Sequence, residues 1–191
     1  MALIIGSFLL YFGVSVISSS DATYTADVNA WCRNDILGFE DFNFDSYAGK
    51  EYKFILVPNI DDTKSYLDAR QNFIQIDKWY FILTGNLKNG SQVNSYYKVD
   101  SVEGPNIFHT QYVNGVETEI HRRYTVYGYK ENRYIQLYLC GKELSERYDV
   151  DLRFLLAFGN VWPTNEEMDE IKANDVNNNF NGSIVGIGSN Y

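Results

Sequence analysis

The sequence lacks the short motifs by which most enzymes are recognised. It contains no Gly-x-Ser-x-Gly elbow of a hydrolase, no His-Glu-x-x-His zinc motif and no glycine-rich phosphate-binding loop. Its two histidines, His109 and His121, fall on neighbouring predicted strands, but no third metal ligand is evident beside them. We therefore expect a protein that is not an enzyme and that uses neither a metal nor a cofactor.

Basic residues are scarce as well. The chain has 16 Lys and Arg against 25 Asp and Glu, for a formal net charge of -9. Nucleic-acid binding requires clustered Lys and Arg that neutralise phosphates, so we exclude a nucleic-acid partner. Solubility is the simplest explanation of the acidity.

The sequence has one long apolar run, at residues 2–17, and this run carries no charge. This run is shorter than the roughly 20 residues of a membrane-spanning helix, and no basic cluster follows it. Ser20 and Ala22 fit the small-x-small rule of signal peptidase. We predict a signal peptide over residues 1–22 rather than a membrane anchor, and hence a secreted protein.

Cysteine is limited to Cys32 and Cys140. In an oxidising compartment one disulfide between them is the economical assignment, and two free thiols are the alternative. Two sequons, which begin at Asn89 and Asn181, lie in turn-like sequence and are candidate sites for N-linked glycans.

Proline is scarce, with 3 residues, whereas the 16 Tyr, 12 Phe and 3 Trp favour β-structure over helix bundles. From residue 50 onward, runs of strand-forming residues alternate with turn signals such as Asn114-Gly115. We predict eight strands at residues 50–57, 66–76, 79–87, 95–102, 106–113, 117–127, 133–140 and 151–158. No helical period separates them, which argues against a parallel sheet. Such a chain is all-β, and an antiparallel up-and-down barrel removes its exposed edges; a β-sandwich is the alternative.

The pattern changes after the eighth predicted strand. Thr164 as N-cap and Glu167 three residues later form a capping box, which predicts one C-terminal α-helix that ends near Asn174. Residues 183–187 are a candidate ninth strand. We expect residues 23–40 to be irregular, and we see one domain over residues 23–191.

Four features of the chain match a known family. The first is the segment Phe44-Asp45-Ser46-Tyr47-Ala48-Gly49-Lys50-Glu51-Tyr52, and the second is Tyr127-Gly128-Tyr129 with a following strand that ends in Tyr138-Leu139-Cys140. The third is the pair of cysteines, and the fourth is the order of eight strands, one helix and a short strand. On these features the chain resembles the lipocalins, in particular the insect bilin-binding and apolipoprotein D-like branch, as a divergent member.

The resemblance implies an eight-stranded barrel and a disulfide between the N-terminal segment and the seventh strand. It also implies carriage of a small hydrophobic ligand such as a fatty acid, a bilin, a retinoid or a pheromone.

The chain departs from the family pattern at the barrel floor. Glu51 replaces the tryptophan of the first motif, and the arginine of the third motif has no evident equivalent, since Ala157-Phe158-Gly159-Asn160 stands in its place. The family register would send Glu51 inward, where burial of its charge needs a partner; exposure to water is the alternative. Phe158, Trp79 and Trp162 are candidates to close the floor.

A closed eight-stranded barrel has room for one small ligand. If side chains alternate as we expect, nine positions on the middle strands face inward. These candidate ligand-binding residues are Tyr80, Ile82, Tyr97, Val99, Phe108, Tyr112, Tyr124, Val126 and Leu137. Each of them is otherwise an ordinary core residue, and a shift of one residue would reverse the assignment of a strand.

Three alternatives stay open, and the third of them is an enzyme, which would need an unpaired Cys140. Only one of Arg122 and Arg123 can face the interior, where it would meet an acidic ligand head group; ordinary exposed strand charge is the simpler explanation. The second alternative concerns the whole protein. It would be a secreted nutritive, structural or protein-binding glycoprotein whose own aromatic side chains fill the barrel.

Overall fold

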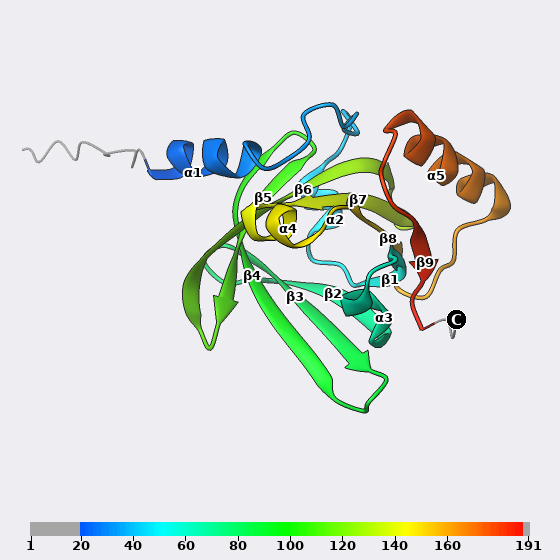
Figure 1. The fold of residues 1–191 in the computed structure, drawn as a ribbon, viewed down its shortest axis with the longest axis horizontal. Helices are drawn as coiled ribbons and strands as arrows, with labels where there is room; N and C mark the ends of the chain where they lie inside the picture. Colours follow the sequence, from blue (N-terminus) through cyan, green and yellow to red (C-terminus); the bar gives the residue numbers. More distant parts are fainter. Residues whose placement is uncertain (1–19, 189–191) are drawn as a thin grey trace, which may run out of the picture.

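The computed structural model describes residues 20–188, and it shows the barrel that the sequence predicts (Figure 1). The strands are β1 (Tyr52–Pro58), β2 (Tyr66–Gln75), β3 (Trp79–Leu87), β4 (Gln92–Glu103), β5 (Asn106–Val113), β6 (Val116–Lys130), β7 (Tyr134–Cys140), β8 (Leu152–Phe158) and β9 (Ile184–Gly186). Their order in the sheet is β2-β3-β4-β5-β6-β7-β8-β1-β9, and all neighbours are antiparallel. This confirms an all-β, eight-stranded up-and-down barrel with an added ninth strand.

Hydrogen bonds between β1 and β2 close the sheet into a barrel at one end only. Strand β1 pairs with β2 through Tyr52 with Gln71 and Lys53 with Arg70. Beyond an irregularity between Phe54 and Leu56, β9 takes the place beside β1 that β2 has left. The strands β1 and β2 therefore diverge toward the other end, which we call the mouth.

Short turns allow consecutive strands to pair. In the β5–β6 hairpin, Asn114 and Gly115 both have positive φ, at 53° and 78°. Two consecutive positive φ values match the turn that suits the twist of a two-residue hairpin, and Asn-Gly is the favoured pair for it. The hairpin predicted at this position is confirmed.

The C-terminal helix α5 (Asn165–Asn177) begins at the predicted capping box. The side chain of Thr164 accepts a hydrogen bond from the Glu167 amide, and the Glu167 carboxylate accepts one of 2.8 Å from the Thr164 amide. Arg133 also donates to this carboxylate at 2.7 Å and lowers the pKa of Glu167 to about 2. Ile171 buries the inner face of α5 against β1, β7 and β8.

The prediction of an irregular N-terminal segment is wrong for residues 23–29, which belong to helix α1 (Ser20–Asn29), whereas residues 30–40 form neither helix nor strand. Its sequence carries no apolar stripe, so its helical state depends on packing rather than on a visible pattern. Val28 and Cys32 lie in a buried cluster with Phe108, Tyr127 and Tyr138 on the outer face of the barrel. This layer explains why Phe108 is buried although it does not face the interior.

Three further short helices were also not predicted. They are α2 (Phe44–Tyr47), α3 (Asp61–Lys64) and α4 (Lys142–Arg147). Each has six residues or fewer, which is too short for a helical period to be visible in sequence. Residues 1–19 of the predicted signal peptide lie outside the described residues, and the predicted cut after Ala22 falls within α1. None of the helices in residues 20–188 has the length and apolar character to cross a bilayer.

The floor of the barrel shows a correction to the family register. Tyr52, and not Glu51, faces the interior, where it is fully buried. Glu51 is exposed and pairs with Arg70. Phe158 contacts the Tyr52 ring at 5.9 Å between centroids, so it does contribute to the floor. Trp79 packs against the same core, whereas Trp162 is 61% exposed and does not.

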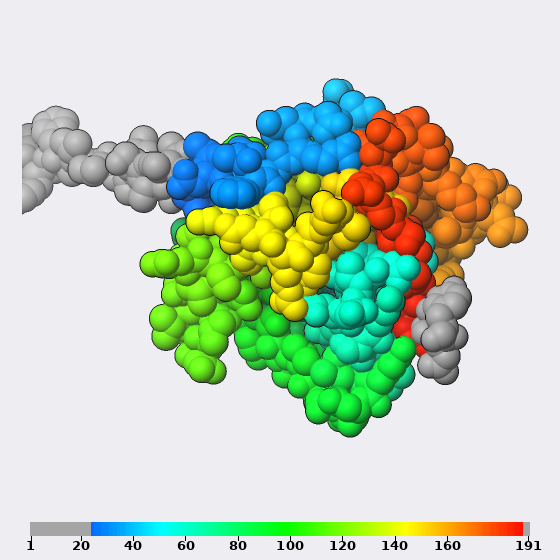
Figure 2. Space-filling model, viewed as in Figure 1, coloured from blue at the N-terminus to red at the C-terminus, as the bar shows by residue number. Residues whose placement is uncertain are grey.

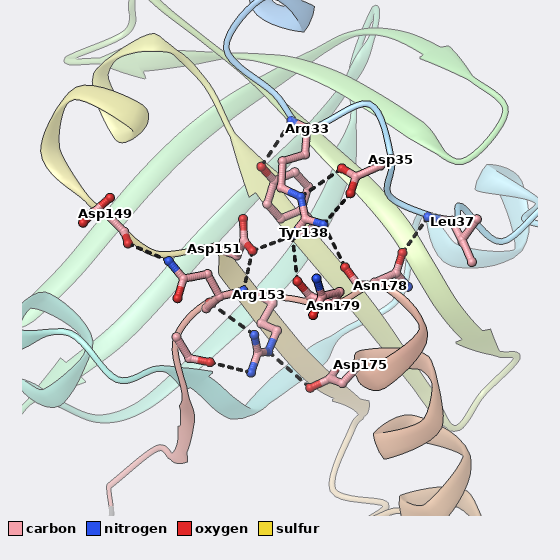
Figure 3. Close-up of polar contacts among 12 residues, drawn as sticks. Arg33, Asp35, Leu37, Tyr138, Asp149, Asp151, Arg153, Asp175, Asn178 and Asn179 are labelled. Atoms are coloured by element: carbon pink, nitrogen blue, oxygen red, sulfur yellow. Dashed lines mark hydrogen bonds and ion pairs between the residues drawn. The ribbon is translucent and has the colours of Figure 1, made fainter.

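Two arginines connect the N-terminal segment, β8 and α5 (Figure 3). Arg33 pairs with Asp151 at 2.6 Å and donates to the Asn178 carbonyl at 2.8 Å. Arg153 pairs with Asp175 at 3.2 Å. These bonds fasten the C-terminal end of α5 and the residue that follows it to the N-terminal segment and to the start of β8.

The predicted disulfide between Cys32 and Cys140 is present, and no cysteine of the described residues is free. It ties the end of the N-terminal segment to β7 across 108 residues of sequence. In the chain-entropy model a loop of this length stabilises the fold by about 4 to 5 kcal/mol.

We predict that replacement of both Cys32 and Cys140 by Ala lowers the free energy of unfolding by about 4 kcal/mol, because the unfolded chain gains loop entropy. Equilibrium unfolding in guanidinium chloride of the oxidised protein and the double variant measures this difference. A loss below about 1 kcal/mol would contradict the loop-closure account.

Candidate ligand-binding pocket

Aromatic side chains fill the middle of the barrel. Phe81 stacks on Tyr97 with 4.8 Å between ring centroids, and His109 stacks on Tyr124 at the same distance. Phe81 also contacts the His109 ring at 4.9 Å. All four side chains are buried, so no ligand can lie at this depth without displacing them.

His109 is an uncharged member of this stack. It is 1% exposed, and burial lowers the pKa of its ring to about 3, assisted by the positive charge of Arg122. His121 instead contacts the ring of Tyr24 outside the barrel, at 4.2 Å between centroids. The two histidines therefore do not meet, and residues 20–188 contain no cluster of side chains suited to a metal ion.

A pocket of about 210 Å³ lies between the aromatic stack and the mouth. Its lining comes from the inner faces of the strands and from the two short helices at the mouth. The lining residues are Phe54, Val57, Ile60, Asp62, Thr63, Tyr66, Ala69, Leu83, Thr84, Gly85, Val93, Ser95, Tyr97, Leu139, Leu144, Tyr148, Leu152, Phe154 and Ile187. Since small-molecule sites usually measure about 300–1,000 Å³, this pocket suits a compact ligand.

The two short helices meet across the mouth. Asp62 of α3 pairs with Arg147 of α4 at 2.8 Å and accepts a hydrogen bond from the Tyr148 hydroxyl. In the space-filling view the residues of α4 lie directly against those of α3 (Figure 2). The Asp62–Arg147 pair is largely exposed and contributes little to stability, so it holds the mouth only weakly.

The nine predicted ligand-binding residues divide into two groups. Five lie in the core cluster of the barrel: Tyr97, Val99, Tyr124, Val126 and Leu137. Four face away from it: Tyr80, Ile82, Phe108 and Tyr112. Only Tyr97 of the nine lines the pocket.

The second group reflects a register error of one residue on β3 and β5. On β3 the inward residues are Phe81 and Leu83, and on β5 they are Ile107 and His109. Both faces of these strands carry apolar or aromatic side chains, so alternation alone does not identify the inner face. The pocket residues missed for this reason include Leu83. Asp62 was missed because it lies in the unpredicted helix α3, and Tyr148 because it directly follows the unpredicted helix α4.

A larger hollow of about 420 Å³ lies outside the barrel, beside the disulfide. Among its charged residues, Arg33 and Asp151 already pair with each other. We therefore place the candidate site in the barrel. Both sequon residues, Asn89 and Asn181, are exposed, and glycosylation there stays a prediction.

We predict that the His109 ring stays neutral well below pH 6, because its pKa is lowered to about 3. In the unfolded chain the His109 ring takes up a proton near pH 6.5, whereas in the folded chain it stays unprotonated at that pH. The free energy of unfolding should therefore fall by about 1.4 kcal/mol per pH unit from this residue alone as pH drops from about 6 toward 4.

NMR titration of the His109 ring carbons measures the pKa directly. Comparison of urea unfolding at pH 6 and pH 4 for the wild type and His109→Phe isolates the slope of this residue. A ring that titrates near pH 6.5 would show that it is not buried as described.

Comparison with known proteins bears on the fold. No family model and no curated protein matches the sequence. Among solved structures, lobster apocrustacyanin A1 is 16% identical with a TM-score of 0.54, over 91% of this chain and 88% of that one. The allergen Per a 4 from cockroaches is 14% identical with a TM-score of 0.56, over 71% and 82%.

The amine binding protein of Rhodnius prolixus, in its tryptamine complex, is 10% identical with a TM-score of 0.58, over 77% of this chain and 80% of that one. All three neighbours are lipocalins. Sequence identities this low carry information on architecture alone. The similarity to these three structures, together with the strand order and the C-terminal helix, shows that this chain has the lipocalin fold.

Proposed function

We propose that the protein is a secreted carrier that holds one compact, largely apolar molecule in the pocket at the barrel mouth. The observation that carries this proposal is a pocket of about 210 Å³ that is enclosed by aliphatic and aromatic side chains at the open end of a lipocalin barrel. Pockets of this kind, with few polar groups, are typical of small-molecule sites. No catalytic arrangement of side chains enters this proposal, and we assign the protein no enzymatic activity.

The size of the pocket narrows the ligand class. A bilin, a retinoid or a long fatty acid needs far more room than the space above the Phe81, Tyr97, His109 and Tyr124 stack. A molecule of pheromone size, with one ring or a short chain, suits it better. Tryptamine, the ligand in the Rhodnius complex, is a molecule of this compact kind.

One observation favours the second candidate function. The aromatic stack fills the middle of the barrel, as expected for a nutritive, structural or protein-binding glycoprotein whose interior is packed with its own side chains. We rank this function below the carrier because the packing stops short of the mouth.

We predict that Leu83→Trp abolishes probe binding, because Leu83 lines the pocket and the larger indole would occupy it. Fluorescence titration with N-phenyl-1-naphthylamine, a compact lipophilic probe, measures the loss, which we expect to exceed tenfold in Kd. Leu37→Trp adds the same side chain at an exposed position and should leave Kd within twofold. A wild-type protein that binds no probe, and releases no small molecule in native mass spectrometry, would support the packed-barrel alternative instead.

Secretion yields a separate prediction. When the full chain is expressed in insect cells, we expect it in the medium with Thr23 as its first residue. Removal of N-linked glycans should lower its mass if Asn89 or Asn181 is used, and Asn→Gln at each position identifies which one. N-terminal sequencing that finds the leader intact, or protein that stays in the cells, would refute secretion.

A further inference from the structure

Tyr97 offers a hydrogen-bond donor to the pocket. It lies on β4, lines the pocket and is 5% exposed. Its hydroxyl oxygen accepts a hydrogen bond of 3.3 Å from Nη1 of Arg122. A phenol can accept and donate at the same time, and no acceptor for the Tyr97 proton occurs among residues 20–188. That proton is therefore free to bind a ligand.

Arg122, which does not line the pocket, holds the Tyr97 hydroxyl in place. Of the two neighbouring arginines, Arg122 faces the interior and Arg123 faces outward, where it donates to Asn29. The Arg122 guanidinium lies 5.8 Å from the centroid of the Tyr97 ring, and its Nε donates to Glu143 of α4. A guanidinium that is held on two sides keeps the phenol in one orientation and makes it a stronger donor.

Charges around the pocket are balanced in pairs. Arg122 is compensated by Glu143, and neither of them is part of the lining. At the mouth, Asp62 is compensated by Arg147. A charged ligand of either sign would therefore be buried without a free counter-ion, which is costly. A neutral ligand that carries one acceptor oxygen would satisfy the Tyr97 hydroxyl without this penalty.

We propose that Tyr97, positioned by Arg122, determines specificity, and that the ligand is a compact neutral molecule with a carbonyl oxygen, such as a ketone, an aldehyde or an ester. This inference rests on the proposed function of the pocket. It adds the class of ligand and the side chain that selects it.

Four indoles of nearly equal size test the proposal. They are 3-acetylindole with a carbonyl, 3-ethylindole without a polar substituent, tryptamine with an ammonium and indole-3-acetate with a carboxylate. Displacement of N-phenyl-1-naphthylamine from the full protein gives each Kd. We expect 3-acetylindole to bind about tenfold tighter than 3-ethylindole, as one hydrogen bond in a buried site predicts, and both charged indoles to bind more weakly than 3-acetylindole.

Tyr97→Phe removes the hydroxyl and keeps the ring that stacks on Phe81. It should weaken 3-acetylindole about tenfold and leave the Kd of 3-ethylindole unchanged. Tyr66→Phe is the matched control, because Tyr66 lines the same pocket and should preserve the ratio of the two affinities. Arg122→Met should lower that ratio without changing the Kd of 3-ethylindole, and thermal unfolding checks that each variant is folded.

Each outcome has one meaning. Tighter binding of tryptamine or indole-3-acetate than of 3-acetylindole would overturn the proposed ligand class. An equal loss for both neutral indoles in Tyr97→Phe, or the same change of ratio in Tyr66→Phe, would show that Tyr97 does not select the ligand. Failure of all four indoles and the probe to bind the wild type would instead reject the pocket itself as the site.

Discussion

The pocket depends on how one edge of strand β1 divides its hydrogen bonds between β2 and β9. At the floor, β1 pairs with β2 over Tyr52 and Lys53, and this short contact closes the barrel. Toward the mouth, β9 replaces β2 beside β1. If β1 were paired with β2 along its full length, the two strands would lie side by side at both ends of the barrel. The early departure of β2 leaves the space that α3, α4 and the pocket occupy.

The interior is divided between side chains that fill it and a smaller space that they leave. The stack of Phe81, Tyr97, His109 and Tyr124 occupies the middle of the barrel, and burial keeps His109 uncharged. Close packing of this kind sets the depth of the pocket, because interiors at crystal-like density leave no further room. Tyr97 belongs to both regions, since its ring packs in the stack while its residue lines the pocket.

The floor shows that the fold does not require the usual tryptophan and arginine of the lipocalin motifs. Tyr52 and Phe158 pack there instead, and the ammonium of Lys50 lies 5.9 Å from the Phe158 ring centroid. Glu51 is left outside with Arg70. An aromatic pair with a nearby cation thus packs at the floor of this barrel. The divergence in sequence is accommodated locally, and the strand order is unchanged.

The sequence alone predicts the strands, the hairpin turn at Asn114-Gly115, the capping box of α5 and the disulfide. These depend on local chemistry, on turn residues and on the number of cysteines, all of which are visible in one dimension. It also assigned the inward faces of β4 and β6 correctly, where Tyr97 and Tyr124 lie in the core. It did not separate the faces of β3 and β5, because Phe108 is covered by the N-terminal segment and both sides of β3 are apolar.

The location of the pocket and the choice of side chains that line it depend on tertiary packing. Helix α1 has no apolar stripe, and α3 and α4 are too short to show a period, so their positions come from packing alone. The approach of Asp62 to Arg147 joins positions 85 residues apart. The hydrogen bond from Arg122 to Tyr97 likewise joins two strands that are not neighbours in the sheet. Local patterns cannot specify contacts of this kind, because they arise only when the curved sheet brings its inner faces together.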